Sequence, residues 1–389
     1  MNLLFYCQRS AGMGHLMRSR ALSEALGGRF NVTFVSGGVI PQGMRMPPGV
    51  SVVQLPPVGM DADGHLVSRD RRRTVDHALV ERRRMFLETY RTRRPRVIVI
   101  DLFPFGRRRF LPELEPVLEE ARQGAHGEAL VFCSLRDILV SRRRPDHDAR
   151  VPELLARYFD GVLVHSDPSF AKLEETFTDA IQKRLPVLYT GFVRGGGAAV
   201  ARRSPVRPGS IVVSVGAGHV GETLLRCAVD AYALIPPPVR LPLTLLAGPL
   251  LPRAAWRALR AVTRNRPGIE LHRWVADLAS TLKTAAASIS QCGYNTAIDL
   301  LDSRVPALVL PFGEGSEDEQ LKRARRLEAL GLVRVLLPKD LTAGRLAEEM
   351  SGLPRFQPPA AGLSMDGTTR TAALLSRFAQ ASIVRPGVR

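Results

Sequence analysis

Short apolar runs alternate with amphipathic stretches through the first half of the chain. The apolar runs, bounded by glycine, proline and charged residues, cover residues 2–7, 31–35, 50–55, 96–101, 129–133, 161–165 and 186–190. Helical spacing of apolar residues predicts helices over 74–92, 112–123, 151–158 and 168–175, with another directly after the first run. Strands that alternate with helices in this way are typical of a parallel sheet covered by helices on both faces.

The pattern stops at residues 196–209, where glycine, proline and arginine replace periodic apolar positions, and then starts again. New apolar runs cover residues 210–215, 241–247, 268–271, 286–289, 306–310 and 332–337. We therefore expect an α/β protein with two doubly wound, Rossmann-like domains, residues 1–195 and 210–365, facing each other across a cleft. In residues 366–389, an amphipathic segment over 367–380 is expected to pack back toward the first domain. Ligands of such sheets bind beyond the carboxyl ends of the strands.

Composition narrows the class of protein. The 55 Lys and Arg against 37 Asp and Glu give a net charge of +18, but the excess is spread along the chain and is almost entirely arginine. No motif typical of nucleic-acid binding accompanies it, so we expect no nucleic-acid partner. The four cysteines lie far apart, which argues against a zinc cluster or a disulfide framework. The first apolar run is too short for a signal peptide, and we expect a cytoplasmic protein.

The first glycine loop follows the first predicted strand and opens a helix. It contains Gly12, Gly14, His15 and Arg18. Small residues let a ligand approach the backbone, and the start of a helix favours an anion. A neutral imidazole at His15 could take a proton from a hydroxyl group. The alternative is that His15 only caps the helix or packs beneath it.

The second glycine loop, residues 216–221, follows the strand predicted at 210–215. It contains Gly216, Gly218, His219 and Gly221 and fits the pattern G-x-G-x-x-G between a strand and a helix. Nicotinamide binding would need a carboxylate at the end of the next strand, which instead ends in Leu-Ala-Gly-Pro at 246–249. The loop therefore indicates a cradle for a diphosphate or, alternatively, a tight turn without a ligand.

Polar residues follow the strand predicted at 286–289. Ser290 and Gly293 form a turn, a helix begins near Asn295 and Thr296, and Asp299 lies one turn inside it, where it could accept hydrogen bonds from ribose hydroxyls. An acidic segment at 314–320 precedes another predicted helix. The sequence Asp61-Ala62-Asp63 has the D-x-D form of a metal site but is interpreted as a solvated loop.

In combination, the motifs GMGHLMR, SQCGYNTAIDLL, PALVLPF and EQLKRARRLEALG resemble the two-domain GT-B glycosyltransferases, and in pattern the MurG-type N-acetylglucosaminyltransferases of glycosyltransferase family 28. The resemblance extends from about residue 3 to residue 337. It implies an inverting, metal-independent transfer of N-acetylglucosamine or a related hexose from a UDP-sugar to an acceptor hydroxyl. The UDP-sugar is the substrate, and no cofactor is expected.

The resemblance also implies roles for individual residues. His15 corresponds to the loop histidine that acts as general base or orients the acceptor. Asp299 takes the place of the glutamate that binds ribose. The donor site is expected to comprise Gly216, Gly218, His219, Trp274, Val275, Ser290, Gly293, Asn295, Thr296, Asp299, Glu319 and Gln320. Segment 272–275, with Trp274 and Val275, would read the base, and Glu319 and Gln320 would contact the sugar.

Two questions stay open at the level of sequence. The first loop is also similar to the G-x-G-H-x-x-R loop of PseG-type nucleotide-sugar hydrolases, so release of free sugar to water is the alternative reaction. The acceptor is an unidentified small molecule, glycan or lipid-linked molecule. If it is lipid-linked, the arginines at 71–73, 82–84 and 107–109 could contact the inner face of the membrane, although surface arginines without a function are the simpler interpretation.

Overall fold

The chain forms two compact units. The computed structural model describes residues 1–9, 12–41, 44–61, 64–139, 150–175, 185–195, 206–218, 220–275, 277–313 and 318–381. The N-terminal unit contains Met1–Asp137, Arg142–Val193 and Leu363–Arg389, and the C-terminal unit contains Ile138–Ser141 and Arg194–Gly362. Most of the predicted linker, residues 196–205, lies outside the described residues.

A sheet of seven parallel strands forms the centre of the N-terminal unit as far as the structure describes it, in the order β3-β2-β1-β6-β7-β8-β9. The strands β2 and β3 lie on one side of β1, and the strands β6 to β9 lie on its other side. The strand order therefore reverses between β1 and β6, which is where ligands of doubly wound sheets bind. The strands are β1 (Asn2–Cys7), β2 (Asn31–Ser36), β3 (Ser51–Gln54), β6 (Val97–Asp101), β7 (Leu130–Arg136), β8 (Gly161–His165) and β9 (Val187–Tyr189).

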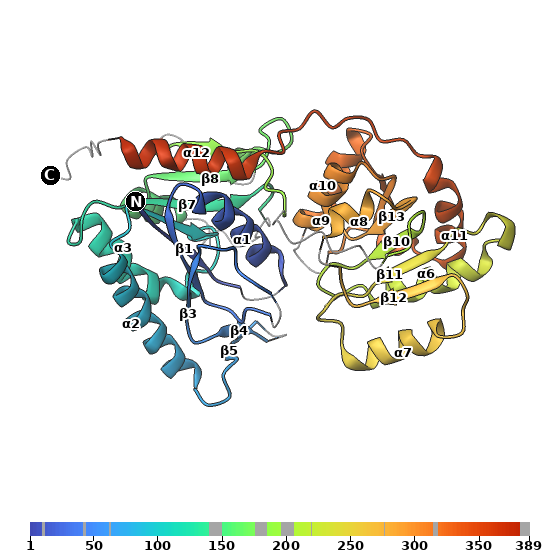
Figure 1. Ribbon diagram of the computed structural model, residues 1–389, viewed down its shortest axis with the longest axis horizontal. Helices are drawn as coiled ribbons and strands as arrows, with labels where there is room; N and C mark the ends of the chain where they lie inside the picture. The colour runs from blue at the N-terminus through green and yellow to red at the C-terminus, as the bar shows by residue number, and fades with distance from the viewer. Residues whose placement is uncertain are drawn as a thin grey trace. The chain divides into compact units, whose positions relative to one another are not determined.

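Helices cover both faces of this sheet because its central strands are apolar on both sides. Leu3 and Phe5 of β1 pack in one core with residues of α1 and α12. On the opposite face, Tyr6 packs against Phe86 of α2, with ring centroids 5.1 Å apart. The last helix, α12, lies over the sheet of the N-terminal unit (Figure 1), and Phe378 contacts Phe132 of β7. The helices are α1 (Gly14–Gly27), α2 (Val75–Arg93), α3 (Leu111–Gln123), α5 (Val151–Tyr158) and α12 (Gly367–Gln380).

The C-terminal unit repeats this architecture. Its described residues form a sheet of six parallel strands in the order β12-β11-β10-β13-β14-β15, so the order reverses between β10 and β13. Its strands are β10 (Ile211–Ser214), β11 (Leu243–Leu246), β12 (Ile269–His272), β13 (Ala287–Ser290), β14 (Ala307–Val309) and β15 (Arg334–Val335). Its helices are α6 (Glu222–Leu234), α7 (Arg253–Thr263), α8 (Leu278–Leu282), α9 (Tyr294–Ser303), α10 (Glu319–Ala329) and α11 (Ala343–Gly352). The predicted pair of doubly wound α/β domains is thus confirmed.

The structure corrects the helix expected over 168–175 and adds detail around Asp61. Over 168–175 there is no α-helix, only a 3-10 turn at Leu173–Glu175, because the Asp167 carboxylate accepts hydrogen bonds from the backbone and hydroxyl of Ser169. The strands β4 (Val58–Met60) and β5 (Leu66–Ser68), on either side of Asp61, form an antiparallel hairpin. Asp61 accepts a hydrogen bond from the backbone of His65 in the connecting turn, and Asp63 lies outside the described residues.

Arg82 is not available to a membrane, which corrects the expectation for the arginines at 82–84. Its side chain is fully buried and bonds both oxygens of Glu113, at 2.6 and 2.7 Å. The same guanidinium donates to the backbone oxygens of Gly37 and Pro56 and to the side-chain oxygen of Gln8. A buried ion pair with all its hydrogen bonds satisfied holds α2 and α3 against β1.

Candidate functional site

The first predicted loop lies at the reversal of strand order in the N-terminal unit. It follows β1 and leads into α1, whose first turn contains His15. Asp101 is the last residue of β6, the neighbour of β1 in the sheet. The Nδ1 atom of His15 lies 2.7 Å from Oδ2 of Asp101. Parallel pairing of β1 with β6 thus brings together two residues that are 86 positions apart in the sequence.

Arg18 completes a three-residue cluster. Its guanidinium lies 2.5 Å from Oδ1 of Asp101, and both side chains are almost completely buried. Arg18 was predicted as a residue of the acceptor or diphosphate loop, and its observed contact is with Asp101. Because one Asp101 oxygen faces Arg18 and the other faces His15, the carboxylate is fixed in orientation.

The charges in this cluster determine the state of His15. Interactions with His15 and Arg18 hold the pKa of the Asp101 carboxyl well below its usual range despite its burial. Burial lowers the pKa of His15 to about 4, although Asp101 favours the protonated form. His15 is therefore neutral near pH 7, and because an ionised carboxylate only accepts, Nδ1 carries the proton. The lone pair is then on Nε2, for which the described residues supply no hydrogen-bond partner.

A second buried histidine follows in the same sheet. His165 ends β8, and its ring nitrogens lie 2.9 Å from the hydroxyl of Ser134 and 2.8 Å from that of Thr190. Burial lowers the pKa of His165 to about 3, so the ring is neutral. With both nitrogens bonded to hydroxyls and no solvent exposure, His165 supports the strand ends and is not available to a ligand.

Gly12 and Gly14, the other predicted residues of the first loop, lie around the start of α1. Gly12 has a left-handed backbone, with φ of 61°, and a side chain there would meet open space. Gly14 is the first residue of α1 and is exposed. The backbone next to His15 is therefore accessible, and the helix start carries no acidic side chain.

The second predicted loop lies at the corresponding reversal in the C-terminal unit. Gly218 and Gly221 have φ of 89° and 114°, and a side chain at either would collide with neighbouring atoms. Gly216 also has a left-handed backbone, but a side chain there would meet open space. Gly218 and Gly221 are thus required by the shape of the turn, whereas the space beside Gly216 is open. His219 lies outside the described residues.

The third predicted segment lies beside this loop because β10 pairs with β13, with Ser214 opposite Ser290. Ser290 is buried at the end of β13, and the amide of Gln291 reaches the backbone oxygen of Val220 at 3.3 Å. Two helices, α6 and α9, begin at this edge of the sheet after Gly221 and Gly293, and neither start has a side-chain cap. Helix starts of this kind favour an anion.

Asp299 lies one turn inside α9, on the same side as Asn295 and Thr296. Its carboxylate receives no hydrogen bond from the part of the chain that the structure describes. Partial burial, together with the charges of Asp277 and Asp302, raises the pKa of Asp299 to about 8. Asp302, by contrast, pairs with Arg194 at 2.7 Å and Lys283 at 3.0 Å. Asp299 is thus the carboxylate in this region with capacity for hydrogen-bond donors from a ligand.

The residues at the start of α10 stabilise the same turn. The side-chain oxygen of Gln320 accepts hydrogen bonds from the backbone of Cys292, at 3.0 Å, and of Phe312, at 3.1 Å. The buried Arg323, which sequence reasoning did not single out, donates to the backbone oxygen of Cys292 at 2.7 Å. The predicted sugar contact of Gln320 is therefore limited to its amide nitrogen, and Glu319 is half-buried beside it.

The segment predicted to read the base follows β12. Trp274 is exposed, with 59% of its surface accessible, and Val275 is half-buried. Arg273 holds this segment by stacking on Trp256 at 4.2 Å and by donating to the backbone oxygen of Leu251.

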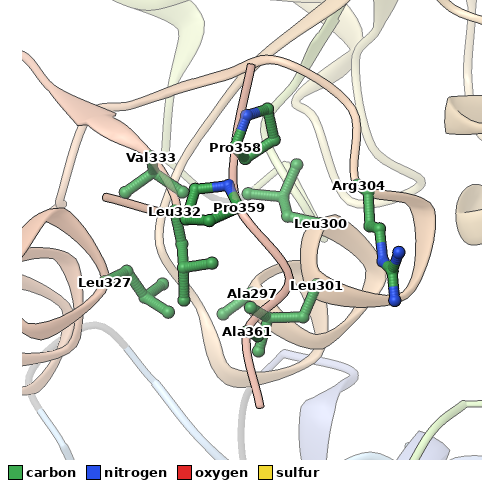
Figure 2. A pocket seen from close by; sticks show the side chains of 10 residues that line it. All are labelled: Ala297, Leu300, Leu301, Arg304, Leu327, Leu332, Val333, Pro358, Pro359 and Ala361. Carbon is green, nitrogen blue, oxygen red and sulfur yellow. The ribbon is translucent and has the colours of Figure 1, made fainter. Parts of the chain in front are cut away.

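A small apolar pocket in the C-terminal unit is separate from these residues. Leu300 of α9 and Arg304, which directly follows α9, line it together with Pro358 and Pro359 (Figure 2). None of the predicted donor-binding residues contributes to its lining. The pocket is therefore not the candidate site.

Asp101 is the main functional residue that sequence reasoning missed. The available signal was a carboxylate at the last position of an apolar run, because such positions face ligands in doubly wound sheets.

No helix in the described ranges is both long enough and apolar enough to span a bilayer.

Comparisons with known proteins show similarity to glycosyltransferases. Residues 256–361 match the family described as "Glycosyltransferase family 28 C-terminal domain". A UDP-N-acetylglucosamine–N-acetylmuramyl-(pentapeptide) pyrophosphoryl-undecaprenol N-acetylglucosamine transferase from Thiobacillus denitrificans is 30% identical over 160 residues, 41% of this chain and 42% of the relative. The transferase of the same name from Alkalilimnicola ehrlichii is 27% identical over 219 residues, 50% of this chain and 60% of the relative. The match thus spans less than two thirds of these curated relatives.

Solved structures extend the likeness to nearly the whole chain. MurG from Acinetobacter baumannii superposes with a TM-score of 0.59 at 15% identity, covering 97% of this chain and all of that one. Os79 from O. sativa in complex with UDP gives a TM-score of 0.61 at 16% identity, with 97% and 100% coverage. The chain therefore has a GT-B fold, and the predicted resemblance to MurG-type glycosyltransferases is confirmed.

Proposed function

We propose that this chain is an inverting, metal-independent glycosyltransferase that transfers N-acetylglucosamine or a related hexose from a UDP-sugar to an acceptor hydroxyl. The observation that carries this proposal is the neutral His15, oriented by Asp101 through Nδ1 and with the Nε2 lone pair open. The similarity of residues 256–361 to a glycosyltransferase family supports the same reaction class. The printed names of the curated relatives support a UDP-sugar as donor.

In the proposed reaction, Nε2 of His15 takes the proton of the acceptor hydroxyl as its oxygen attacks the anomeric carbon of the sugar. The bond between that carbon and the phosphate oxygen breaks, and the electron pair leaves with UDP. Asp101 stabilises the imidazolium that forms, and Arg18 keeps Asp101 ionised and turned toward His15. Direct displacement inverts the configuration at the anomeric carbon.

The C-terminal unit would hold the donor. The starts of α6 and α9 lie at one edge of the sheet and can stabilise the negative charge that builds on the leaving diphosphate. Asp299 would accept hydrogen bonds from the ribose hydroxyls. Trp274 is exposed at the segment where the base would bind. No metal ion is required for this charge stabilisation, because backbone N–H groups supply it.

Hydrolysis of the nucleotide sugar remains the second candidate, because the first loop has the G-x-G-H-x-x-R form and places His15 and Arg18 on one carboxylate. In that reaction, water takes the place of the acceptor hydroxyl, and the products are free sugar and UDP. The acceptor of the transfer reaction would be a small molecule, glycan or lipid-linked molecule. A lipid-linked acceptor would bring the protein to the inner face of the membrane.

The first test is thermal stabilisation by UDP, dTDP, GDP and NAD, and by UDP-sugars, without added metal. A ligand at one hundred times its dissociation constant stabilises a protein by about 2.7 kcal/mol. We expect stabilisation by UDP that is clearly reduced in Asp299→Ala and retained in Asp340→Ala, a change on the turn Pro338–Asp340. Stabilisation by nucleic acid but by none of the nucleotides would overturn the proposal.

The second test follows the sugar. Incubation of the protein with the most stabilising UDP-sugar and candidate acceptors, followed by mass spectrometry, separates glycosylated acceptor from free sugar. NMR of the product then gives its anomeric configuration. An inverted glycoside is the expected product, whereas free sugar at the same rate with or without acceptor would favour the hydrolase.

A further inference from the structure

Four arginines form a row on α7, the helix that packs against β12 at the edge of the C-terminal sheet. They are Arg253, Arg257, Arg260 and Arg264, which we call the arginine stripe. At about 100° per residue, their spacing keeps them within an arc of about 60° and along a line of about 16 Å. All four side chains are exposed, and within the described ranges none of the four guanidinium groups makes a hydrogen bond or an ion pair.

The arginine stripe lowers the stability of α7. Like charges three or four residues apart on a helix repel each other, and a cation in the first turn, such as Arg253, opposes the helix dipole. No Asp or Glu on α7 offsets these charges. Exposed arginines on other helices of this unit have carboxylate partners, in the pairs Arg226–Glu222 on α6, Arg325–Glu328 on α10 and Arg345–Glu348 on α11. The unpaired stripe is therefore a feature of α7 and does not follow from an arginine-rich composition alone.

The next arginines along the chain do not widen the stripe. Arg266 donates a hydrogen bond to the backbone oxygen of Val229, and Arg273 stacks on Trp256. Both side chains are thus held against their own unit. The cationic surface at α7 is therefore a line about one helix wide.

A row of alanines runs beside the stripe. Ala254, Ala258 and Ala261 each follow a stripe residue by one position, and the first and last of them are exposed. Their small side chains allow a second helix to approach to the short end of the usual interaxial range, about 8 Å. The side of α7 that faces the sheet, with Ala255 and Leu259, is packed in the hydrophobic core. The open side of α7 thus presents a charged row next to a row of small residues, which suits packing against another helix.

An acidic helix fits this face better than a bilayer or a nucleic acid does. A helix that lies on a bilayer inserts its apolar side, and the apolar side of α7 is packed in the core. Single-stranded nucleic acids stack on exposed aromatic rings, but Trp256, the aromatic residue of α7, is half-buried and has Arg273 stacked on it. Carboxylates at a matching helical spacing give each arginine a bidentate partner.

We propose that the arginine stripe is a docking surface for an acidic helix of a partner protein, with Asp or Glu at positions i, i+4, i+7 and i+11. Each carboxylate then pairs with one stripe residue, and the alanine row receives the side of the partner helix next to its carboxylates. This inference goes beyond the proposed reaction, because none of the four arginines belongs to the candidate site.

The test uses the full chain and two labelled, alanine-based helical peptides of about twenty residues. Both contain four glutamates and the same hydrocarbon cross-link, which keeps them helical. In the aligned peptide the glutamates have the spacing of the stripe, and in the scattered peptide they lie on different sides of the helix. Fluorescence anisotropy at low salt measures both affinities. We expect the aligned peptide to bind about tenfold more tightly, and its binding to weaken as salt screens these exposed charges.

Two variants with equal net charge locate the binding. In the stripe variant, all four stripe residues are changed to Gln, and binding of the aligned peptide should weaken about ten- to hundredfold. In the control variant, the same change is made at four exposed arginines of the N-terminal unit, Arg71, Arg72, Arg83 and Arg93. The control variant should bind as the wild type does. The stripe variant should unfold at or above the wild-type temperature, because it removes repulsion along α7, so weaker binding cannot be assigned to misfolding.

Equal affinity of the wild type for the two peptides, or equal affinity of the wild type and the stripe variant for the aligned peptide, would overturn the proposal. Vesicles of equal parts phosphatidylglycerol and phosphatidylcholine, and duplex DNA, are tested with the same variants. If either binds through the stripe while the aligned peptide does not bind, the proposal is wrong and the face belongs to a lipid surface or a nucleic acid. Failure of UDP to bind, with these peptide results intact, would overturn the proposed function alone.

Charge reversal tests the pairing directly. Arg257→Glu should weaken binding of the aligned peptide, and changing one of its four glutamates to Lys should restore it, with the other three positions giving no recovery. Recovery at a single position supports one fixed register of paired charges. Recovery at none, or equally at all four, would show that the charges do not pair one to one and would contradict the proposed helix.

Discussion

The two sheets reverse their strand order at corresponding places, but the chemistry at these places differs. In the N-terminal unit, His15, Asp101 and Arg18 are bonded to one another and are largely buried. In the C-terminal unit, the corresponding turns carry glycines and two uncapped helix starts, and Asp299 receives no hydrogen bond from described residues. The N-terminal cluster is suited to the transfer of one proton. The C-terminal turns are suited to a ligand that supplies hydrogen-bond donors and negative charge.

This difference separates the effects of substitutions. Changes in the His15 cluster should affect turnover or the stability of the N-terminal unit and leave nucleotide binding intact. Changes around Asp299 should affect nucleotide binding first. Both tryptophans, Trp256 and Trp274, lie in the C-terminal unit. Their fluorescence therefore reports on nucleotide binding there, and hydrogen exchange in β1 and β6 reports on the other unit.

The largest expected effect is that of His15→Ala on turnover. Loss of a positioned general base lowers a rate by about a hundred- to ten-thousandfold. UDP release from the most stabilising UDP-sugar measures this rate for transfer and hydrolysis alike. UDP affinity, followed by tryptophan fluorescence, should stay within about twofold of wild type. Turnover near the wild-type level would show that His15 is not the base.

Arg18→Met tests whether the cluster depends on its buried ion pair. Removing one partner of such a pair costs about 3–5 kcal/mol, because Asp101 keeps a buried charge without the arginine that is bonded to it. Hydrogen exchange should speed up in β1 and β6, and the acid limb of the pH–rate profile should move to higher pH as Asp101 holds a proton on His15. Arg83→Met, on the exposed side of α2, is the matched control. Unchanged exchange in Arg18→Met would exclude this role.

The local sequence pattern was enough to predict where the loops of both units lie. A glycine turn directly after an apolar run predicted the loops at His15, Gly216 and Ser290, because the end of a parallel strand and the start of a helix are encoded by neighbouring residues. The partners of these loops are not local. Asp101 reaches His15 only through the pairing of β1 with β6, and Arg82 appears in sequence as part of an exposed charge run until Glu113, 31 residues away, is packed against it.

The helix predicted over 168–175 is absent for a similar reason, because a residue far away in the sequence helps to fix the backbone there. Asp167 accepts a hydrogen bond from the backbone of Ser364, which is 197 residues away, and this contact helps to fix the turn in which a local pattern predicts a helix. Spacing of apolar residues contains no information about such a partner. The separate roles of Asp299 and Asp302 were equally hidden, because only the folded chain brings Arg194 and Lys283 to Asp302, while no described residue forms an ion pair with Asp299.

A smaller effect is expected for Asp299→Ala on UDP affinity. Hydrogen bonds to a charged group contribute about 1.5–3 kcal/mol, so affinity should fall roughly ten- to hundredfold. Tryptophan fluorescence measures the loss, and turnover at saturating donor should change little. Asp302→Ala is the matched control on the same helix, since Asp302 is bonded to Arg194 and Lys283. Equal losses in the two variants would mean that Asp299 has no direct contact with the nucleotide.

The smallest expected effect, and the most specific, is the pH dependence of UDP binding. In the free protein the pKa of Asp299 is raised to about 8, so at pH 7 most molecules carry a protonated carboxyl there. Ribose hydroxyls donate to the ionised form, so binding lowers this pKa and releases a proton. Affinity should therefore increase by about tenfold between pH 7 and pH 9, and then level off. UDP titrations at these pH values, in buffers of different ionisation enthalpy, measure both the affinity and the released proton. Asp299→Asn should bind weakly and equally across the range, and an unchanged increase in that variant would assign the proton to another group.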